Sequence, residues 1–93
     1  MSETAARLIV TGRVQGVGYR WWTIGQARRF GLRGWVRNRR DGAVEILAIG
    51  EPDALDRLES VCSHGPDGAL PEQVTREPAT PDTSRGFAQI ATV

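Results

Sequence analysis

The sequence predicts an α+β fold in which two helices cover one face of an antiparallel sheet. Two observations lead to this prediction. Apolar residues repeat at a spacing of two in some segments and of three to four in others, in the order β-α-β-β-α-β with one more strand at the end. Gly, Pro and Asp-Gly fall between those segments, where helices and strands are expected to end. The 93 residues, 40% of them hydrophobic, suffice for one core, so we expect a single domain over residues 1–93.

The first strand and the first helix flank a glycine-containing loop. The strand is predicted over residues 7–13, where apolar side chains alternate. The helix is predicted over residues 20–30, and Gly31 is expected to end it. Its apolar face would consist of Thr23, Ile24, Ala27 and Phe30. Trp22 lies off that face, so we expect it to be partly exposed near the mouth of any site that the loop forms.

A hairpin is predicted at the centre of the chain. Its strands would cover residues 32–38 and 43–49, joined by Arg39-Arg40-Asp41-Gly42. Asp-Gly between two apolar alternating runs is a strong hairpin signal. The two strands should therefore pair antiparallel.

The second helix and the last strands complete the pattern. Pro52 is expected to begin the helix and Gly65-Pro66 to end it. Its apolar stripe would be Leu55, Leu58 and Val61. A weak strand is predicted over residues 74–77 and a final one over residues 86–93, with a proline-containing loop at residues 78–81 between them.

This order of elements is typical of the split β-α-β plan, also called ferredoxin-like. Two right-handed β-α-β crossovers around a central hairpin place both helices on one face of the sheet, here with an extra C-terminal strand. The plan hosts many activities, so the function has to be argued from a candidate site.

The composition excludes several kinds of chemistry. All twelve basic residues are arginine, which excludes Walker-type phosphate binding through lysine and Schiff-base catalysis. One histidine and one cysteine do not suit a zinc site, so we expect no metal and no cofactor. Cys62 falls in an apolar helical stripe and is expected to be buried and unreactive. No apolar run resembles a signal peptide or a membrane span, so we expect a cytoplasmic protein.

Charge is distributed unevenly along the chain. Residues 1–40 carry nine Arg and one Glu, whereas residues 41–93 carry three Arg and ten acidic residues. These charges can cancel in surface pairs of the folded chain. If some of the arginines instead surround a cleft, their field would draw anions to it.

The segment Gly12-Arg13-Val14-Gln15-Gly16-Val17-Gly18-Tyr19-Arg20 is a candidate anion-binding site. Gly16 and Gly18 can adopt positive φ, so successive backbone N–H groups can converge on one anion. Arg20 falls where the helix should begin, and helix N-termini favour anions. A planar guanidinium can also meet two oxygens at once. The loop therefore predicts binding of a small dianion such as a phosphoryl group.

Asn38 is the only asparagine of the chain and falls at the end of a predicted strand, shortly before the Asp-Gly turn. Its neutral amide could orient a water molecule without titrating. The alternative is an ordinary residue preceding a turn.

With these segments the chain resembles the acylphosphatase family, small ferredoxin-like enzymes that hydrolyse carboxyl-phosphate mixed anhydrides. The resemblance rests on residues 12–20 and on Gly34-Trp35-Val36-Arg37-Asn38, continuing through Gly42, Val44 and Gly50. Two motifs in this order are far more specific than a lone glycine-rich triplet.

The resemblance implies that Arg20 and Asn38 are catalytic: Arg20 holds the phosphate together with the loop amides, and Asn38 positions the attacking water. The implied phosphate-binding residues are Gln15, Gly16, Val17, Gly18, Tyr19 and Arg20. It implies neither a metal nor a phosphoenzyme. We expect a monomer that acts on a small-molecule acyl phosphate and holds inorganic phosphate as product ligand, with no nucleic-acid or membrane partner.

The chain departs from the family pattern near its end. Pro71 stands where the family usually has an apolar strand residue. Phe87 and Ile90 cannot share a face of the last strand without a bulge. These departures concern the edge strands rather than the site.

Three alternatives remain open. His64 could act as a general base, although a histidine at the end of a helix commonly serves the helix dipole. The chain could instead bind RNA, since ferredoxin-like domains do so and six arginines lie within residues 28–40, but the aromatic pattern that stacks bases is missing from the sequence. Finally, it could be a catalytically silent phosphate-binding domain, like those fused to hydrogenase-maturation carbamoyltransferases.

Overall fold

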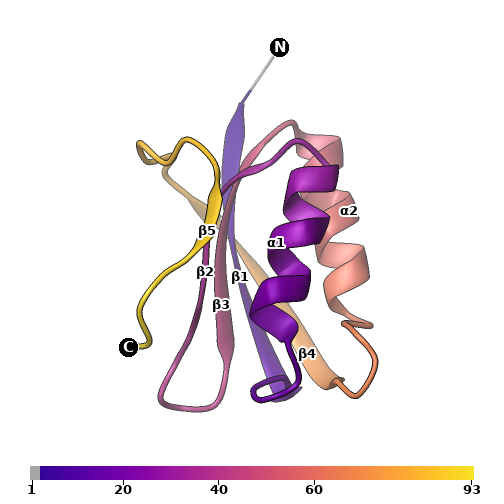
Figure 1. The fold of residues 1–93 in the computed structure, drawn as a ribbon. Coiled ribbons are helices and arrows are strands. Elements are labelled where there is room, and N and C mark those ends of the chain that lie inside the picture. Colours follow the sequence, from indigo (N-terminus) through magenta and orange to yellow (C-terminus); the bar gives the residue numbers. More distant parts are fainter. Residues whose placement is uncertain (1–2) are drawn as a thin grey trace.

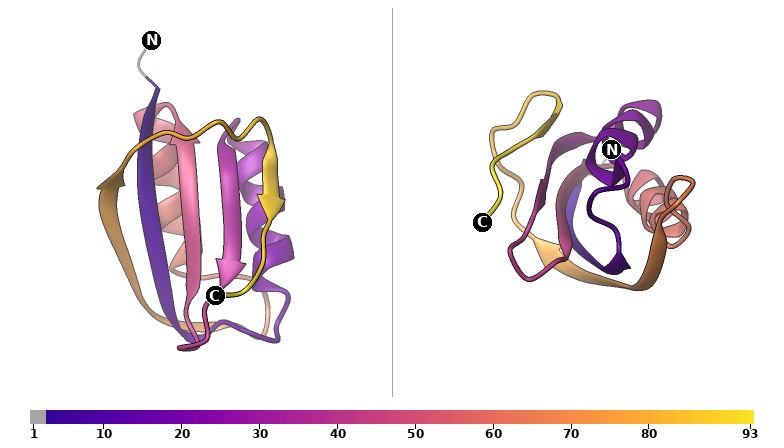
Figure 2. Two further views of the ribbon diagram at one scale, coloured as in Figure 1. Left: turned by 90° about the vertical axis from the view of Figure 1, so that its left-hand side faces the viewer. Right: turned by 60° about the horizontal axis from the view of Figure 1, so that its bottom comes forward.

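The structure, a computed structural model, describes residues 3–93. Its elements are β1 (Thr4–Arg13), α1 (Tyr19–Arg29), β2 (Arg33–Asn38), β3 (Val44–Gly50), α2 (Pro52–Cys62), β4 (Leu70–Ala79) and β5 (Phe87–Gln89). Both helices lie on one face of a five-stranded sheet in the order β4-β1-β3-β2-β5 (Figures 1 and 2). The predicted ferredoxin-like α+β fold is confirmed.

The four strands of the split β-α-β plan form the predicted antiparallel sheet. β3 lies at its centre, between β1 and β2, and β4 pairs with the other side of β1. The extra strand β5 pairs with β2 in parallel, so the complete sheet is mixed. β1 and β2 run in the same direction, which brings their carboxyl ends to the end of the sheet where α1 begins (Figure 1).

The core lies between the helices and the sheet. Its strand residues include Leu8, Val10, Val36, Val44 and Ile46, and its helix residues include Ala27, Leu55, Leu58 and Cys62. Of the face predicted for α1, Thr23 and Ala27 are fully buried, whereas Ile24 and Phe30 are half-buried at its border. Thr23 is accommodated because its hydroxyl donates a hydrogen bond to the carbonyl of Tyr19 at 2.8 Å.

The face of the sheet away from the helices holds a buried carboxylate. Glu45 is 4% exposed and forms ion pairs with Arg37 at 2.9 Å and Arg7 at 3.5 Å. The Arg37 guanidinium also lies 4.7 Å from the ring centroid of Trp35. Part of the positive charge of the first half of the chain is thus neutralised here by an acidic residue of the second half, although this carboxylate is buried and not at the surface as predicted.

β4 is longer than predicted. It includes Pro71 and Pro78, which the sequence placed at or beyond its ends. Proline is tolerated because β4 is an edge strand, where an N–H facing solvent has no strand to bond. A β-bulge sits where Thr11 pairs with Gln73 and Gly12 with Pro71. A Cβ at Gly12 would lie 2.5 Å from a backbone oxygen, so the close approach requires glycine.

β5 is shorter than predicted, and it contains no bulge. Phe87 is buried against the helices, whereas Ile90 is 37% exposed beyond the strand end. Gln89, two positions after Phe87, lies on the same face of the sheet as Phe87, the face covered by the helices. It pairs with Val36 of β2. The chain continues to follow β2, because the N–H of Val93 donates to the carbonyl of Asn38 at 3.2 Å.

Candidate active site

The two predicted catalytic residues meet where α1 begins and β2 ends. A pocket of about 120 Å³ is lined there by Gly16, Gly18, Tyr19, Arg20 and Asn38, among others. The loop follows β1, so the carboxyl ends of two parallel strands and one helix N-terminus converge on this pocket. The crossover topology therefore brings together residues that are separated in sequence.

The conformation of the loop depends on its glycines. Gly16 and Gly18 have φ values of 75° and 79°, as the sequence predicts. A Cβ at either position would meet nothing within 4 Å, so glycine is needed for the backbone conformation rather than for space. Gly18 is also the N-cap of α1, and no side chain caps this helix.

The remaining loop residues fix the loop to the fold. Val14 is fully buried and Val17 packs against the core. The Gln15 side chain donates from Nε2 to the carbonyl oxygens of Arg39 and Ala43, at 2.7 and 2.9 Å, which ties the loop to the β2–β3 hairpin. Any phosphate contact by Gln15 or Val17 would therefore use a backbone N–H group.

The loop presents backbone donors without protein acceptors. Within residues 3–93, no backbone N–H from Gln15 to Trp21 donates to a protein group. The first turn of α1 contains no acidic residue and instead carries Arg20. The ion pairs of the described chain engage Arg7, Arg33, Arg37, Arg39 and Arg76, not Arg20. A cation near the positive end of a helix is unfavourable alone, so this arrangement suits a bound anion.

Asn38 contributes an unpaired acceptor. It is the last residue of β2, on the same side of the strand as the buried Val36. Its Oδ1 atom is buried and accepts no hydrogen bond from any residue that the structure describes. A buried polar atom without a partner costs free energy, about 1–3 kcal/mol, which a water or substrate donor would remove.

Sequence reasoning missed two residues that line the pocket, Trp21 and Gln89. Val14 lines it too and belongs to the predicted loop segment, although it was given no role there. Gln89 could not be placed because Phe87 and Ile90 could share a face only with a bulge, which left the layout of the last strand open. Trp21 is 80% exposed and adjoins Arg20, whereas Trp22 is half-buried and packs 5.3 Å from the Tyr19 ring. The partial exposure predicted for Trp22 is confirmed, but the tryptophan of the pocket is Trp21.

Inorganic phosphate is expected to change the fluorescence of Trp21 on binding, because this ring lines the pocket. A Trp21→Phe variant should lose most of the phosphate-dependent change in a fluorescence titration, whereas Trp22→Phe should keep it. If Trp22→Phe lost the change and Trp21→Phe kept it, Trp22 would be the residue whose fluorescence reports phosphate binding.

Tyr19 serves the fold through its ring. Tyr19 is 1% exposed, and its hydroxyl donates a hydrogen bond of 2.6 Å to the carbonyl of Cys62 at the end of α2. Burial raises the pKa of Tyr19 far above its ordinary value, and burial also raises the pKa of the Cys62 thiol to about 12. The predicted burial of Cys62 is confirmed, and we expect neither group to ionise near neutral pH.

A Tyr19→Phe variant is expected to lose about 1 kcal/mol of unfolding free energy, because the buried Cys62 carbonyl loses its donor. Denaturant unfolding would measure this loss. Phosphate affinity should stay unchanged, since only the backbone of Tyr19 is predicted to contact phosphate; weaker phosphate binding would show that the hydroxyl acts on the site.

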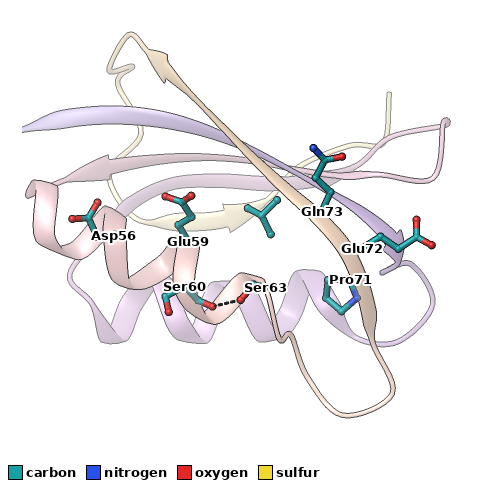
Figure 3. A pocket seen from close by; sticks show the side chains of 8 residues that line it. Asp56, Glu59, Ser60, Ser63, Pro71, Glu72 and Gln73 are labelled. Atoms are coloured by element: carbon teal, nitrogen blue, oxygen red, sulfur yellow. Dashed lines mark hydrogen bonds between the residues drawn. The ribbon is translucent and has the colours of Figure 1, made fainter.

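Other hollows and reactive groups lie elsewhere. His64 is exposed just beyond the end of α2 and does not line the pocket. A larger cavity of about 480 Å³ lies between α2 and β4, where Figure 3 shows Asp56, Glu59 and Glu72. Asp56 and Glu59 are paired with Arg76, at 2.7 and 3.0 Å.

In residues 3–93 no three His, Cys, Asp or Glu side chains are grouped as metal ligands, and no helix is long and apolar enough to cross a membrane.

The fold and the pocket define a ferredoxin-like domain with a pocket at the start of its first helix. A family model described as Acylphosphatase matches residues 6–89. The chain therefore belongs to the acylphosphatase family. It is an enzyme of the class that hydrolyses acyl phosphates, so its substrate is a small-molecule acyl phosphate.

Individual relatives agree over nearly the whole chain. An acylphosphatase of Nitrobacter hamburgensis is 39% identical over 99 residues, covering 100% of both chains. The structure of an acylphosphatase from Coxiella burnetii superposes with a TM-score of 0.91 at 33% identity, covering 95% of this chain and 93% of that one. One from Bacillus subtilis has a TM-score of 0.89 at 34% identity, covering 92% and 97%.

Proposed function

We propose that the chain hydrolyses the carboxyl-phosphate bond without a metal, holding the phosphoryl group with the loop amides and Arg20 and positioning the attacking water with Asn38. The observation that carries this proposal is the convergence of these groups on one pocket. None of these groups has a hydrogen-bond partner within the described chain: the amides and the guanidinium have no protein acceptor, and Asn38 Oδ1 has no donor.

These groups suit the reaction. The leaving group is a stable carboxylate, so the P–O bond breaks with little help from a general acid. What remains is to position the phosphoryl group and stabilise charge on its equatorial oxygens. Fixed N–H donors and one planar guanidinium do this without reorganising, because the loop is anchored at Val14, Gln15 and Tyr19.

Asn38 suits the role of a water holder better than that of a phosphate ligand. Its amide is neutral, so it adds little to the binding of a dianion. Its acceptor oxygen can accept a hydrogen bond from the attacking water and so direct a lone pair of that water toward phosphorus.

The character of the site supports a mechanism without a metal. The pocket presents N–H donors, one guanidinium and amide groups, and no carboxylate is among its lining residues in the described chain. Such a positive site attracts the phosphate itself and repels a divalent cation.

One assay tests the proposal. Purified protein should release equal amounts of carboxylate and inorganic phosphate from a generic acyl phosphate, at the same rate with and without a metal chelator. A rate that falls with the chelator and returns with a divalent cation would contradict the metal-free mechanism. Phosphate binding without hydrolysis would instead support the catalytically silent domain.

A further inference from the structure

Trp21 connects the active-site pocket to a second hollow. The side chain is 80% exposed, which is unusual for so large an apolar group. It lines the 120 Å³ pocket and also a hollow of about 210 Å³ on the outer side of α1. Trp22, Gly25 and Arg28 line that hollow too. The two spaces are therefore neighbours that share Trp21 in their lining.

Gly25 is unexplained by the fold. It lies in the middle of α1, where glycine is less favourable than alanine. Its φ is not positive, and a Cβ there would meet nothing within 4 Å, so neither conformation nor crowding requires it. Residues four apart are neighbours on a helix surface, so the missing side chain leaves the flank of the Trp21 ring open.

We propose that Trp21 and Gly25 form an acyl subsite that favours substrates with a bulky, apolar and preferably planar acyl group. The inference rests on the proposed function, which places the phosphoryl group among the loop amides and Arg20. The acyl group must then leave this small pocket along its wall, and Trp21 is the exposed aromatic residue of that wall, whereas Tyr19 is buried. Beyond it the surface continues into the hollow over Gly25.

The chemistry of the hollow fits such a group. A tryptophan face gives a planar acyl group apolar contact and favourable ring packing. The described residues lining either space include no carboxylate that would repel the phosphorylated substrate. Arg28, at the hollow, has its Nη2 bonded to the carbonyl of Phe87 at 3.1 Å, which holds this side chain in place.

The test compares two substrates and three variants. Benzoyl phosphate carries a planar apolar acyl group, whereas acetyl phosphate has only a methyl group. The ratio of kcat/KM for benzoyl phosphate to that for acetyl phosphate is expected to fall about tenfold in Trp21→Ala, since the apolar contact is lost. Gly25→Gln should lower the ratio as well, because a polar side chain then fills the hollow. The midpoint of thermal unfolding of this variant should be at least as high as that of the unmodified protein, since glutamine favours a helix more than glycine does.

The control is Leu70→Ala, which removes another exposed apolar side chain, 64% exposed on β4 and outside both spaces. It should leave the ratio unchanged. If both substrates lost equally in Trp21→Ala, or if Gly25→Gln kept the wild-type ratio, the acyl subsite would be refuted while the proposed hydrolysis stood. If the unmodified protein hydrolysed neither substrate, the proposed function would fail and the subsite with it.

Discussion

An Arg20→Lys variant is expected to lose on the order of 10³-fold in kcat/KM toward an acyl phosphate, and Arg20→Ala to lose turnover altogether. The guanidinium lines the pocket beside the loop amides and forms no ion pair within residues 3–93. A lysine keeps the charge but offers a point charge in place of a planar fork, so it cannot hold two phosphoryl oxygens in fixed positions. Both variants should also lose binding of inorganic phosphate, measured by calorimetry.

A matched control is Arg29→Lys, in the last turn of the same helix and away from the pocket. It should retain wild-type turnover and phosphate affinity. Wild-type phosphate affinity in Arg20→Lys would count decisively against a bidentate role for Arg20, since the charge alone would then suffice.

Replacing Asn38 with alanine is expected to lower kcat by about 10²-fold and to change phosphate affinity little, by analogy with the loss of one preorganised polar group. The amide lines the pocket at the end of β2, and its buried Oδ1 has no donor among the described residues. Steady-state kinetics and phosphate calorimetry on the same preparation separate the two effects, because a water holder acts on the chemical step and a ligand on binding.

Asn38→Asp gives a sharper contrast. A carboxylate can also hold a water but repels the phosphate, so this variant should lose phosphate affinity as well as kcat. An Asn38→Ala variant with intact kcat, or one that loses phosphate affinity as strongly as Arg20→Ala, would refute the water-holding role and leave Asn38 an ordinary residue before a hairpin turn.

The predictable part of this molecule is the part in which local chemistry and topology agree. Gly16 and Gly18 signal positive φ by residue type alone, and the structure confirms both. That Asn38 reaches the same pocket follows from the crossover, which brings the end of β2 to the start of α1. In the sequence it was the resemblance to the acylphosphatase family that implied a joint role for the loop, Arg20 and Asn38.

Three errors have separate physical origins. Trp21 and Trp22 are adjacent on α1 and point about 100° apart, so only one of them can face the pocket, and only Trp22 was considered for that position from the sequence. Pro71 and Pro78 argued against a strand because an edge position cannot be recognised from local sequence. Gln89 was missed because the buried Phe87 and the apolar Ile90 suggested a bulge, whereas the strand runs regularly and leaves Ile90 outside.

The prolines of β4 have a consequence for the behaviour of many copies of the chain. A sheet open at both sides can template edge-to-edge aggregation, because free N–H and C=O groups along an edge accept a strand from another molecule. Pro71 and Pro78 each remove a donor from the outer edge at β4, and the opposite edge, β5, is only three residues long. At β4 a strand from another molecule would therefore meet a row of hydrogen-bonding groups interrupted by the prolines, and at β5 a very short row. Both edges disfavour strand pairing between molecules, even at high protein concentration.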